Sequence, residues 1–178
     1  MRAQKESGDT AQISTDSGSQ VNGWTAGSGF KYERYDVTDL GTKTYAGLKT
    51  ELAGAHSLPL LESGIRWELQ TAAVYDGVYG EVFKGYFYAP VTGNYIFRGV
   101  CDDNFGLYIS EEYGSVSVPA TPYIYEDSYT PRSNAYNLFI TNHTTAFGEE
   151  IAFEAGRYYY MEAYHLNTGG EGYMKIQV

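Results

Sequence analysis

Two adjacent acidic residues, Asp102 and Asp103, separate two segments whose apolar and aromatic residues are typical of β-strands. In an extended chain, neighbouring side chains point to opposite faces, so two consecutive carboxylates do not normally converge on one ion. A cis peptide bond between them would let both carboxylates face the same ion, and a divalent hard cation is the interaction that would favour this arrangement. The other interpretation is an ordinary polar turn, because Asp and Asn, here Asn104, favour turns.

Calcium is the hard cation that fits this pattern. It binds oxygen atoms from carboxylates, backbone carbonyls, Asn side chains and water, and it takes about six to eight of them. Two aspartates are too few to complete such a shell. A calcium site at Asp102 and Asp103 would therefore need further ligands from a second loop.

Catalytic chemistry has weaker support in the sequence. No G-x-S-x-G motif or recognisable nucleophile accompanies the three histidines, which are His56, His143 and His165. His165 follows alternating strand residues, a position where a histidine is more often structural or solvated than catalytic. The chain contains no P-loop and no EF-hand loop. We therefore expect that this chain is not an enzyme.

The remaining nucleophile and acid candidates have simpler interpretations. Cys101 ends an apolar segment, where a lone cysteine is usually a small buried hydrophobic residue. The acid pairs Glu111-Glu112 and Glu149-Glu150 lie in predicted loops or at strand starts. Adjacent acids in such places are solvated far more often than they form the carboxylate pair of a glycosidase.

Composition and charge exclude several classes of protein. The 178 residues include 22 acidic and 12 basic side chains, so the formal net charge is −10. Nucleic acids and anionic membrane surfaces favour clustered Lys and Arg, so neither is an expected partner. The single Cys excludes an internal disulfide and a multi-cysteine zinc site. No apolar run is long enough for a membrane-spanning segment, and residues 1–20 lack the apolar core of a signal peptide.

The chain divides into a polar tail and one globular module. Residues 1–22 contain no aromatic residue and many Ser, Thr, Gly and Gln, which predicts a disordered tail. Residues 23–178 have the aromatic content of a folded domain. Because the sequence ends inside a predicted strand, we expect the module to be part of a larger chain with neighbouring domains.

From Phe30 onward the residue pattern is typical of an all-β protein. Leu40–Ala55 is the only plausible helix, and it is short and interrupted by glycine. Prolines at 119, 122 and 131 predict that 111–132 is a long loop. Strands are predicted at 30–37, 65–69, 82–88, 94–101, 105–110, 136–140, 150–154, 157–165 and 173–178. Short strands at such spacing favour an antiparallel sandwich or barrel.

Several of these segments together resemble the PA14 domain. Phe83–Phe97, which includes the turn Pro90–Gly93, resembles the central hairpin signature of the family, and Asp102-Asp103 follows at the family spacing. Phe105–Ile109 and Ile151–Tyr159 resemble later family segments, and the similarity extends over about residues 24–178. The resemblance implies an antiparallel β-sandwich or barrel found as a module in adhesins, glycosidases, toxins and surface receptors.

The lectin branch of the PA14 family, which includes flocculins and bacterial adhesin modules, implies a specific site. There, the Asp pair binds Ca2+ through a cis peptide, and the ion holds vicinal hydroxyl groups of a sugar. The segment from Met161 to Asn167 resembles the flocculin strand that ends in an Asn ligand. Carried over to this sequence, the metal site comprises Asp102, Asp103, Asn167, Gly169 and Glu171, and the carbohydrate-binding residues are Asp102, Asp103, Asn167 and Gly170. Glu171 would contribute its carbonyl oxygen and either adds its carboxylate or is merely solvated.

These implications lead to three functional hypotheses. The first is a calcium-dependent lectin or adhesion module that binds glycans outside the cell or at its surface. The second is a structural or protein-interaction PA14 module, and the third is an accessory domain of a glycoside hydrolase. Asn142 begins an N-x-T sequon and is a candidate glycosylation site in a secreted eukaryotic protein.

Overall fold

The structure is a computed structural model, and it describes residues 20–21, 24–25, 29–41, 43–53, 56–71, 75–127 and 146–178. The strand predicted at 136–140 and the candidate glycosylation site Asn142 lie outside these residues. So does the predicted tail, except for Gln20–Val21, which forms strand β1 and pairs with β2 (Trp24–Thr25). No helix in the described ranges is long and apolar enough to span a membrane.

Most of the strands belong to one antiparallel sheet of eight strands. Its larger part has the order β4-β3-β5-β12-β8-β9. These strands are β3 (Phe30–Asp36), β4 (Leu60–Arg66), β5 (Tyr75–Ala89), β8 (Asn104–Ile109), β9 (Ile124–Glu126) and β12 (Arg157–Gln177).

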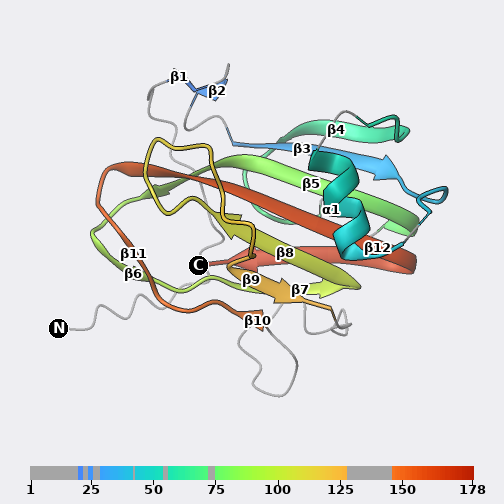
Figure 1. Ribbon diagram of the computed structural model, residues 1–178. Coiled ribbons are helices and arrows are strands. Elements are labelled where there is room, and N and C mark those ends of the chain that lie inside the picture. Colours follow the sequence, from blue (N-terminus) through green and yellow to red (C-terminus); the bar gives the residue numbers. More distant parts are fainter. Residues whose placement is uncertain are drawn as a thin grey trace.

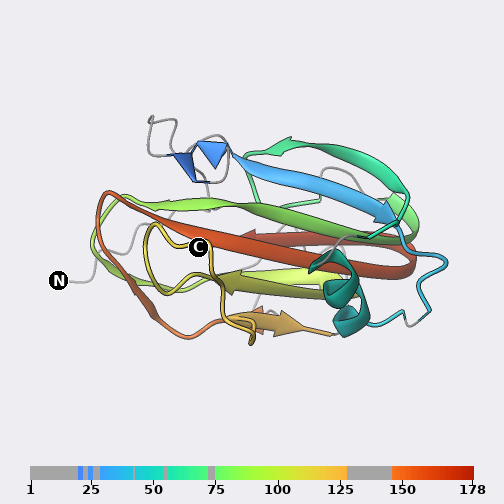
Figure 2. The same ribbon diagram turned by 45° about the horizontal axis from the view of Figure 1, so that its top comes forward.

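Strand β12 connects this part of the sheet to a second layer. Figures 1 and 2 show that β12 bends at one end of the sheet and that its last residues run back beside β7. β7 (Arg98–Asp102) also pairs with β10 (Ala146–Phe147). A separate two-stranded sheet joins β6 (Gly93–Tyr95) to β11 (Ile151–Phe153).

The main core lies on one face of β3 and β5. Alternate residues of these strands, including Phe30, Tyr32, Phe83 and Phe87, are buried there with residues of β8 and the end of β12. The other face of the sheet is covered by helix α1 (Tyr45–Ala53), whose Leu48 and other apolar residues meet a second buried cluster. β5 is therefore buried on both faces over much of its length, as expected for a central strand.

The predicted class, all-β and antiparallel with one short helix, is confirmed. Several boundaries were wrong. The predicted strand 94–101 is interrupted at Ile96 and Phe97, and the strand predicted at 65–69 is instead Leu60–Arg66. The predicted loop 111–132 contains β9. The last two predicted strands are one strand, with an irregular register between Thr168 and Glu171.

Candidate metal and glycan site

The turn between β7 and β8 contains the Asp pair. The peptide bond between Asp102 and Asp103 is cis. The turn lies against β12, because the backbone nitrogen of Asp103 donates to the carbonyl oxygen of Leu166 at 3.2 Å. β12 bends just beyond this point, so the two segments that carry the predicted ligands, 102–103 and 167–171, lie next to each other.

The Asp103 carboxylate is tied to β12 by Thr168. Its Oδ2 accepts hydrogen bonds from the Thr168 backbone nitrogen at 2.8 Å and from the Thr168 hydroxyl at 2.5 Å. Partial burial raises the pKa of Asp103, but these hydrogen bonds outweigh the burial, so its pKa lies below the ordinary value. Asp103 is therefore a carboxylate at neutral pH.

The Asp102 carboxyl group has the opposite shift. Desolvation is the largest cause, and the hydrogen bond and charge of Asp103 add to it, so the pKa of Asp102 rises to about 6. The two adjacent carboxylates repel each other when both are ionised. A nearby cation would stabilise both ionised forms.

Asn167 provides an unpaired oxygen atom beside this turn. Its side chain is fully buried, and its Nδ2 donates to the carbonyl oxygens of Gly77 at 2.6 Å and of Gly170 at 3.0 Å. Among the residues that the structure describes, its buried Oδ1 has no hydrogen-bond partner. Buried polar atoms are nearly always paired. The two hydrogen bonds of Nδ2 fix the orientation of the Asn167 amide, so its Oδ1 is held in a position to bind a water molecule or a cation.

The glycine-rich segment after Asn167 is exposed. Gly169 and Gly170 have φ angles of 147° and 74°, which favour glycine. Gly170 is close to Asn167 through its carbonyl oxygen. Glu171 is exposed and lies opposite Asp76 in the β12–β5 pair. The ligand roles of Gly169 and Glu171 remain predictions.

The donor atoms next to the turn are oxygens of the types that calcium binds. Among the described residues, no group of three or more His, Cys, Asp or Glu side chains could hold a metal ion. Asp102 and Asp103 provide two carboxylates, and the remaining available atoms are amide and carbonyl oxygens such as Asn167 Oδ1. Oxygen ligands of this mixed type are what Ca2+ prefers.

Three residues near the turn were not predicted from the sequence: Thr168, which contacts Asp103, and the buried pair Arg34 and Glu81. Glu81 is fully buried, between Tyr79 and Phe83 on the core face of β5. An acidic residue at an alternate position among buried aromatic residues is a detectable signal, because an isolated buried charge is very costly.

His165 is also fully buried, which agrees with a structural interpretation and excludes a solvated one. Cys101 is buried, as expected.

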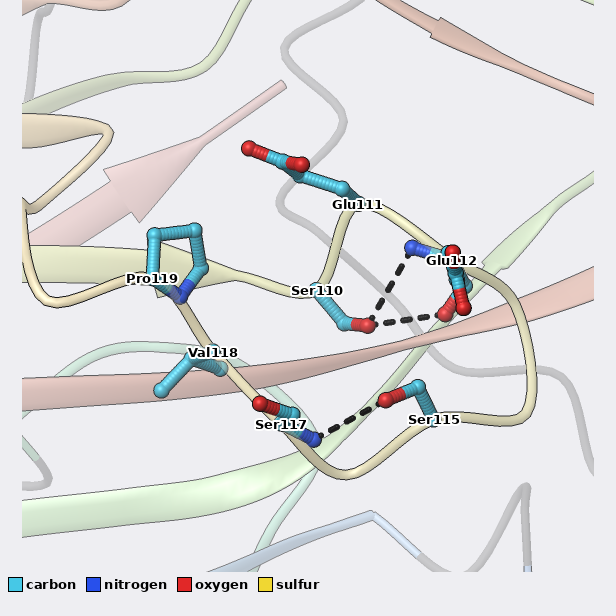
Figure 3. Close-up of a pocket in the computed structure, with 7 residues that line it drawn as sticks. All are labelled: Ser110, Glu111, Glu112, Ser115, Ser117, Val118 and Pro119. Atoms are coloured by element: carbon cyan, nitrogen blue, oxygen red, sulfur yellow. Dashed lines mark hydrogen bonds between the residues drawn. The ribbon is translucent and has the colours of Figure 1, made fainter.

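A hollow of about 360 Å³, separate from the turn, is lined by residues of the loop after β8. In Figure 3 the Ser110 hydroxyl faces the backbone of Glu112, and the Ser115 hydroxyl faces the backbone nitrogen of Ser117. The hydroxyl groups of Ser110 and Ser115 are thus engaged in local turns. The carboxylates of Glu111 and Glu112 are exposed, as predicted for solvated acids.

Comparisons with known proteins identify the fold. The chain matches no protein-family model and no curated protein. It is similar to the solved structure of the epithelial adhesin 6 A domain from Candida glabrata in complex with Galβ1-3GlcNAc, with 14% identity and a TM-score of 0.56, covering 96% of this chain and 84% of that chain. A PA14 sugar-binding domain from an RTX adhesin is also similar, with 13% identity and a TM-score of 0.58, covering 84% of this chain and 88% of that chain.

A third similar structure is an enzyme. The β-glucosidase from Kluyveromyces marxianus in complex with glucose aligns with 95% of this chain but only 18% of its own chain, with 8% identity and a TM-score of 0.53. The chain therefore has the fold of PA14 domains, and structures with this fold include sugar-binding adhesin domains and a segment of a glycosidase.

Proposed function

We propose that this chain is a calcium-dependent carbohydrate-binding module that acts in adhesion outside the cell or at its surface. The observation that carries the proposal is the buried, unpaired Oδ1 of Asn167 beside the Asp102-Asp103 turn. The turn and Asn167 are also the elements to which the PA14 resemblance assigns a calcium site. Sugar-binding adhesin domains among the similar structures support the same function.

In this proposal the residues divide into metal ligands and sugar contacts. Asp102, Asp103 and Asn167 contribute side-chain oxygens, and the carbonyl oxygens of Gly169 and Glu171 complete the protein ligands. A bound Ca2+ ion would supply coordination positions for two vicinal hydroxyl groups of a sugar. The Asp carboxylates accept hydrogen bonds from these hydroxyl groups, and such charge-assisted bonds are stronger than neutral ones.

Affinity for a single sugar is expected to be weak. Few atoms of a monosaccharide are engaged, and little apolar area is buried. Adhesion then depends on several copies of the module, or on neighbouring domains of a longer chain, acting together. The partners are glycans on a cell surface or a polysaccharide.

Glycan-array binding and calorimetry test this function. Binding should require Ca2+, disappear with a chelator and disappear in Asp103→Ala and Asp103→Asn. Glu154→Gln, at an exposed position just before the start of β12 and so at the other end of that strand from Asn167, is the control for the loss of one acidic charge and should bind like the wild type. Sugar binding that persists with chelator and in both Asp103 variants would overturn the proposal.

The similarity to a β-glucosidase segment favours one alternative, an accessory domain of a glycoside hydrolase. The same measurements separate it from a purely structural module. A melting temperature that responds to Ca2+ without any response to a sugar indicates a structural calcium site. A sugar response limited to the substrate of an adjoining hydrolase domain indicates the accessory role.

A further inference from the structure

A chain of buried polar residues, which includes the ion pair of Arg34 and Glu81, lies behind the Asp turn. Arg34, Glu81 and His165 come from the adjacent strands β3, β5 and β12, and Glu81 lies opposite the other two in the strand pairing. Arg34 is 4% exposed, and Glu81 and His165 are fully buried. Together they form a hydrogen-bonded line that runs from Arg34 on β3 through Glu81 on β5 to His165 on β12, next to the turn.

The Glu81 carboxylate is the centre of this line. Its Oε1 accepts from Arg34 Nη2 at 2.8 Å and from the Tyr32 hydroxyl at 2.8 Å, and its Oε2 accepts from the Thr71 hydroxyl at 2.9 Å. Burial raises its pKa, but the hydrogen bonds and charges of His165 and Arg34 outweigh burial and lower the pKa to about 2. Glu81 is therefore an ionised acceptor at neutral pH.

His165 joins this carboxylate to the Asp turn. Its Nδ1 lies 2.7 Å from Glu81 Oε2, and its Nε2 lies 2.8 Å from the carbonyl oxygen of Asp102. Each ring nitrogen thus lies within hydrogen-bond distance of an acceptor oxygen, so His165 bridges the Glu81 carboxylate and the Asp102 carbonyl. The Asp102 carbonyl belongs to the peptide that joins Asp102 to Asp103, so His165 fixes the orientation of the peptide from which both carboxylates extend.

Stability alone does not account for this arrangement. Replacing a buried ion pair by apolar residues of similar volume is often neutral or stabilising, because desolvation of the charges offsets their attraction. The hydrogen-bonded line ends on one particular atom, the carbonyl oxygen of Asp102. This is the geometry of residues that do not bind a metal themselves but orient the residues that do.

We propose that His165 is a positioning residue of the calcium site, held by Glu81 and Arg34, which fixes the Asp102-Asp103 peptide so that both carboxylates face one divalent cation. This inference rests on the proposed function. Outer-layer residues of this kind typically change metal affinity by roughly 10- to 100-fold. Loss of the hydrogen bond between His165 and the Asp102 carbonyl oxygen should therefore weaken cation binding by more than a loss of folding stability alone would explain.

Two substitutions at His165 separate the two contacts. In His165→Asn the amide nitrogen takes the place of Nδ1 and still faces Glu81, whereas in His165→Gln it takes the place of Nε2 and still faces the Asp102 carbonyl. Tyr32→Phe is the matched control, because it removes one hydrogen bond to Glu81 on the side away from Asp102. Each variant is titrated with Ca2+ by calorimetry and with Tb3+ by luminescence, and melted in chelator.

We expect His165→Asn to bind both ions at least about tenfold more weakly than the wild type, and His165→Gln to stay within about threefold. Tyr32→Phe should lose stability in chelator but keep its affinity. Wild-type affinity in His165→Asn, or equal losses in His165→Asn and His165→Gln, overturns the positioning role. A wild-type protein that binds neither ion overturns the proposed calcium site itself.

A measurement on the wild type remains decisive if the His165 variants do not fold. Nitrogen-15 NMR of the imidazole rings reports both ring nitrogens during a Ca2+ titration. The His165 signals should shift at saturating Ca2+ while those of His56 stay constant, since His56 packs against Tyr35. Unchanged His165 signals at saturation overturn the inference.

Discussion

The Thr168 side chain and backbone both donate to the same oxygen of Asp103, at 2.5 Å and 2.8 Å. One carboxylate oxygen is thereby fixed on β12, and the orientation of the other follows from it. Charge-assisted hydrogen bonds of this kind keep the carboxylate ionised and its rotamer fixed. Thr168 therefore connects the Asp turn to the strand that also carries Asn167.

Thr168→Val tests this connection, because it removes the hydroxyl donor and keeps the backbone donor and the side-chain shape. We expect the pKa of Asp103 to rise toward its ordinary value, since its lowering depends on the Thr168 hydrogen bonds. Stability in chelator should fall by about 1 kcal/mol, as for one lost hydrogen bond. NMR titration of the Asp103 carboxyl group and denaturant unfolding measure the two effects.

The control for this substitution is Thr50→Val. Thr50 is on α1 and donates to the carbonyl oxygen of Ala46, so the same chemical group is removed at a distance from the turn. It should leave the Asp103 titration unchanged. An unchanged Asp103 titration in Thr168→Val would show that the hydroxyl does not hold the carboxylate.

The raised pKa of Asp102 predicts that calcium binding depends on pH. Because desolvation and Asp103 raise the pKa of Asp102 to about 6, a proton competes with the cation below that pH. Affinity should fall by up to about tenfold per pH unit below pH 6 and level off above it. Calorimetric titrations at several pH values between 5 and 8 measure this, and a constant affinity across that range would contradict it.

The raised pKa of Asp102, which weakens Ca2+ binding at low pH, should stabilise the metal-free protein at low pH. The folded state binds the Asp102 proton more tightly than the unfolded state, so this group favours folding at low pH. That contribution is present below about pH 4 and is lost as pH rises to about 6. Asp102→Asn should remove this pH-dependent part of the unfolding free energy, measured in chelator, and an unaltered pH profile would argue against it.

Gly172→Ala should disturb Asn167 directly. A Cβ atom at Gly172 would collide with the Asn167 side chain and the Tyr79 hydroxyl. Overpacking of this kind costs about 1–3 kcal/mol, and displacement of Asn167 should weaken Ca2+ binding by about tenfold or more. Calorimetry and thermal unfolding are the measurements.

Gly93→Ala is its matched control, because nothing lies within 4 Å of a Cβ atom there. It should be close to neutral in both measurements. If Gly172→Ala lowers stability but binds Ca2+ like the wild type, Asn167 is not a ligand.

The sequence predicted the strand types and the acid pair because their signals are local. Alternating aromatic residues predict β3, β5 and β8, and the Pro90–Gly93 turn separates β5 from β6. Boundaries failed where tertiary pairing decides them. β9 forms at Ile124–Glu126 because proline excludes only the residues it occupies and because β8 offers a pairing edge.

The supporting residues of the site could not be predicted in the same way. Asn167 was assigned from a resemblance, but nothing local in the sequence shows that Arg34, Glu81 and His165 meet. Their contact depends on the register between β3, β5 and β12, which long-range packing determines. The glycine-rich segment 168–172 has the composition of a loop, yet it continues β12 through an irregular register.

Removing one member of the buried ion pair should be strongly destabilising. Arg34→Met leaves the buried Glu81 carboxylate without the guanidinium that bonds it at 2.8 Å. Such a loss typically costs about 3–5 kcal/mol, and Arg34→Met/Glu81→Leu should recover only part of it, because the double variant also leaves the buried His165 Nδ1 without its acceptor. Urea unfolding at pH 7 measures both variants.

An exposed ion pair provides the comparison for this prediction. Arg157→Met removes the contact of Arg157 with Glu154 at 3.6 Å, and it should cost at most about 1 kcal/mol. The wild-type contribution of Glu81 should persist above about pH 4.5 and disappear as pH falls toward 2, because its folded pKa is lowered to about 2. In Arg34→Met this loss should begin at higher pH, since the guanidinium is one of the causes of the lowered pKa. Equal destabilisation by Arg34→Met and Arg157→Met would mean that the buried pair carries no special weight in folding.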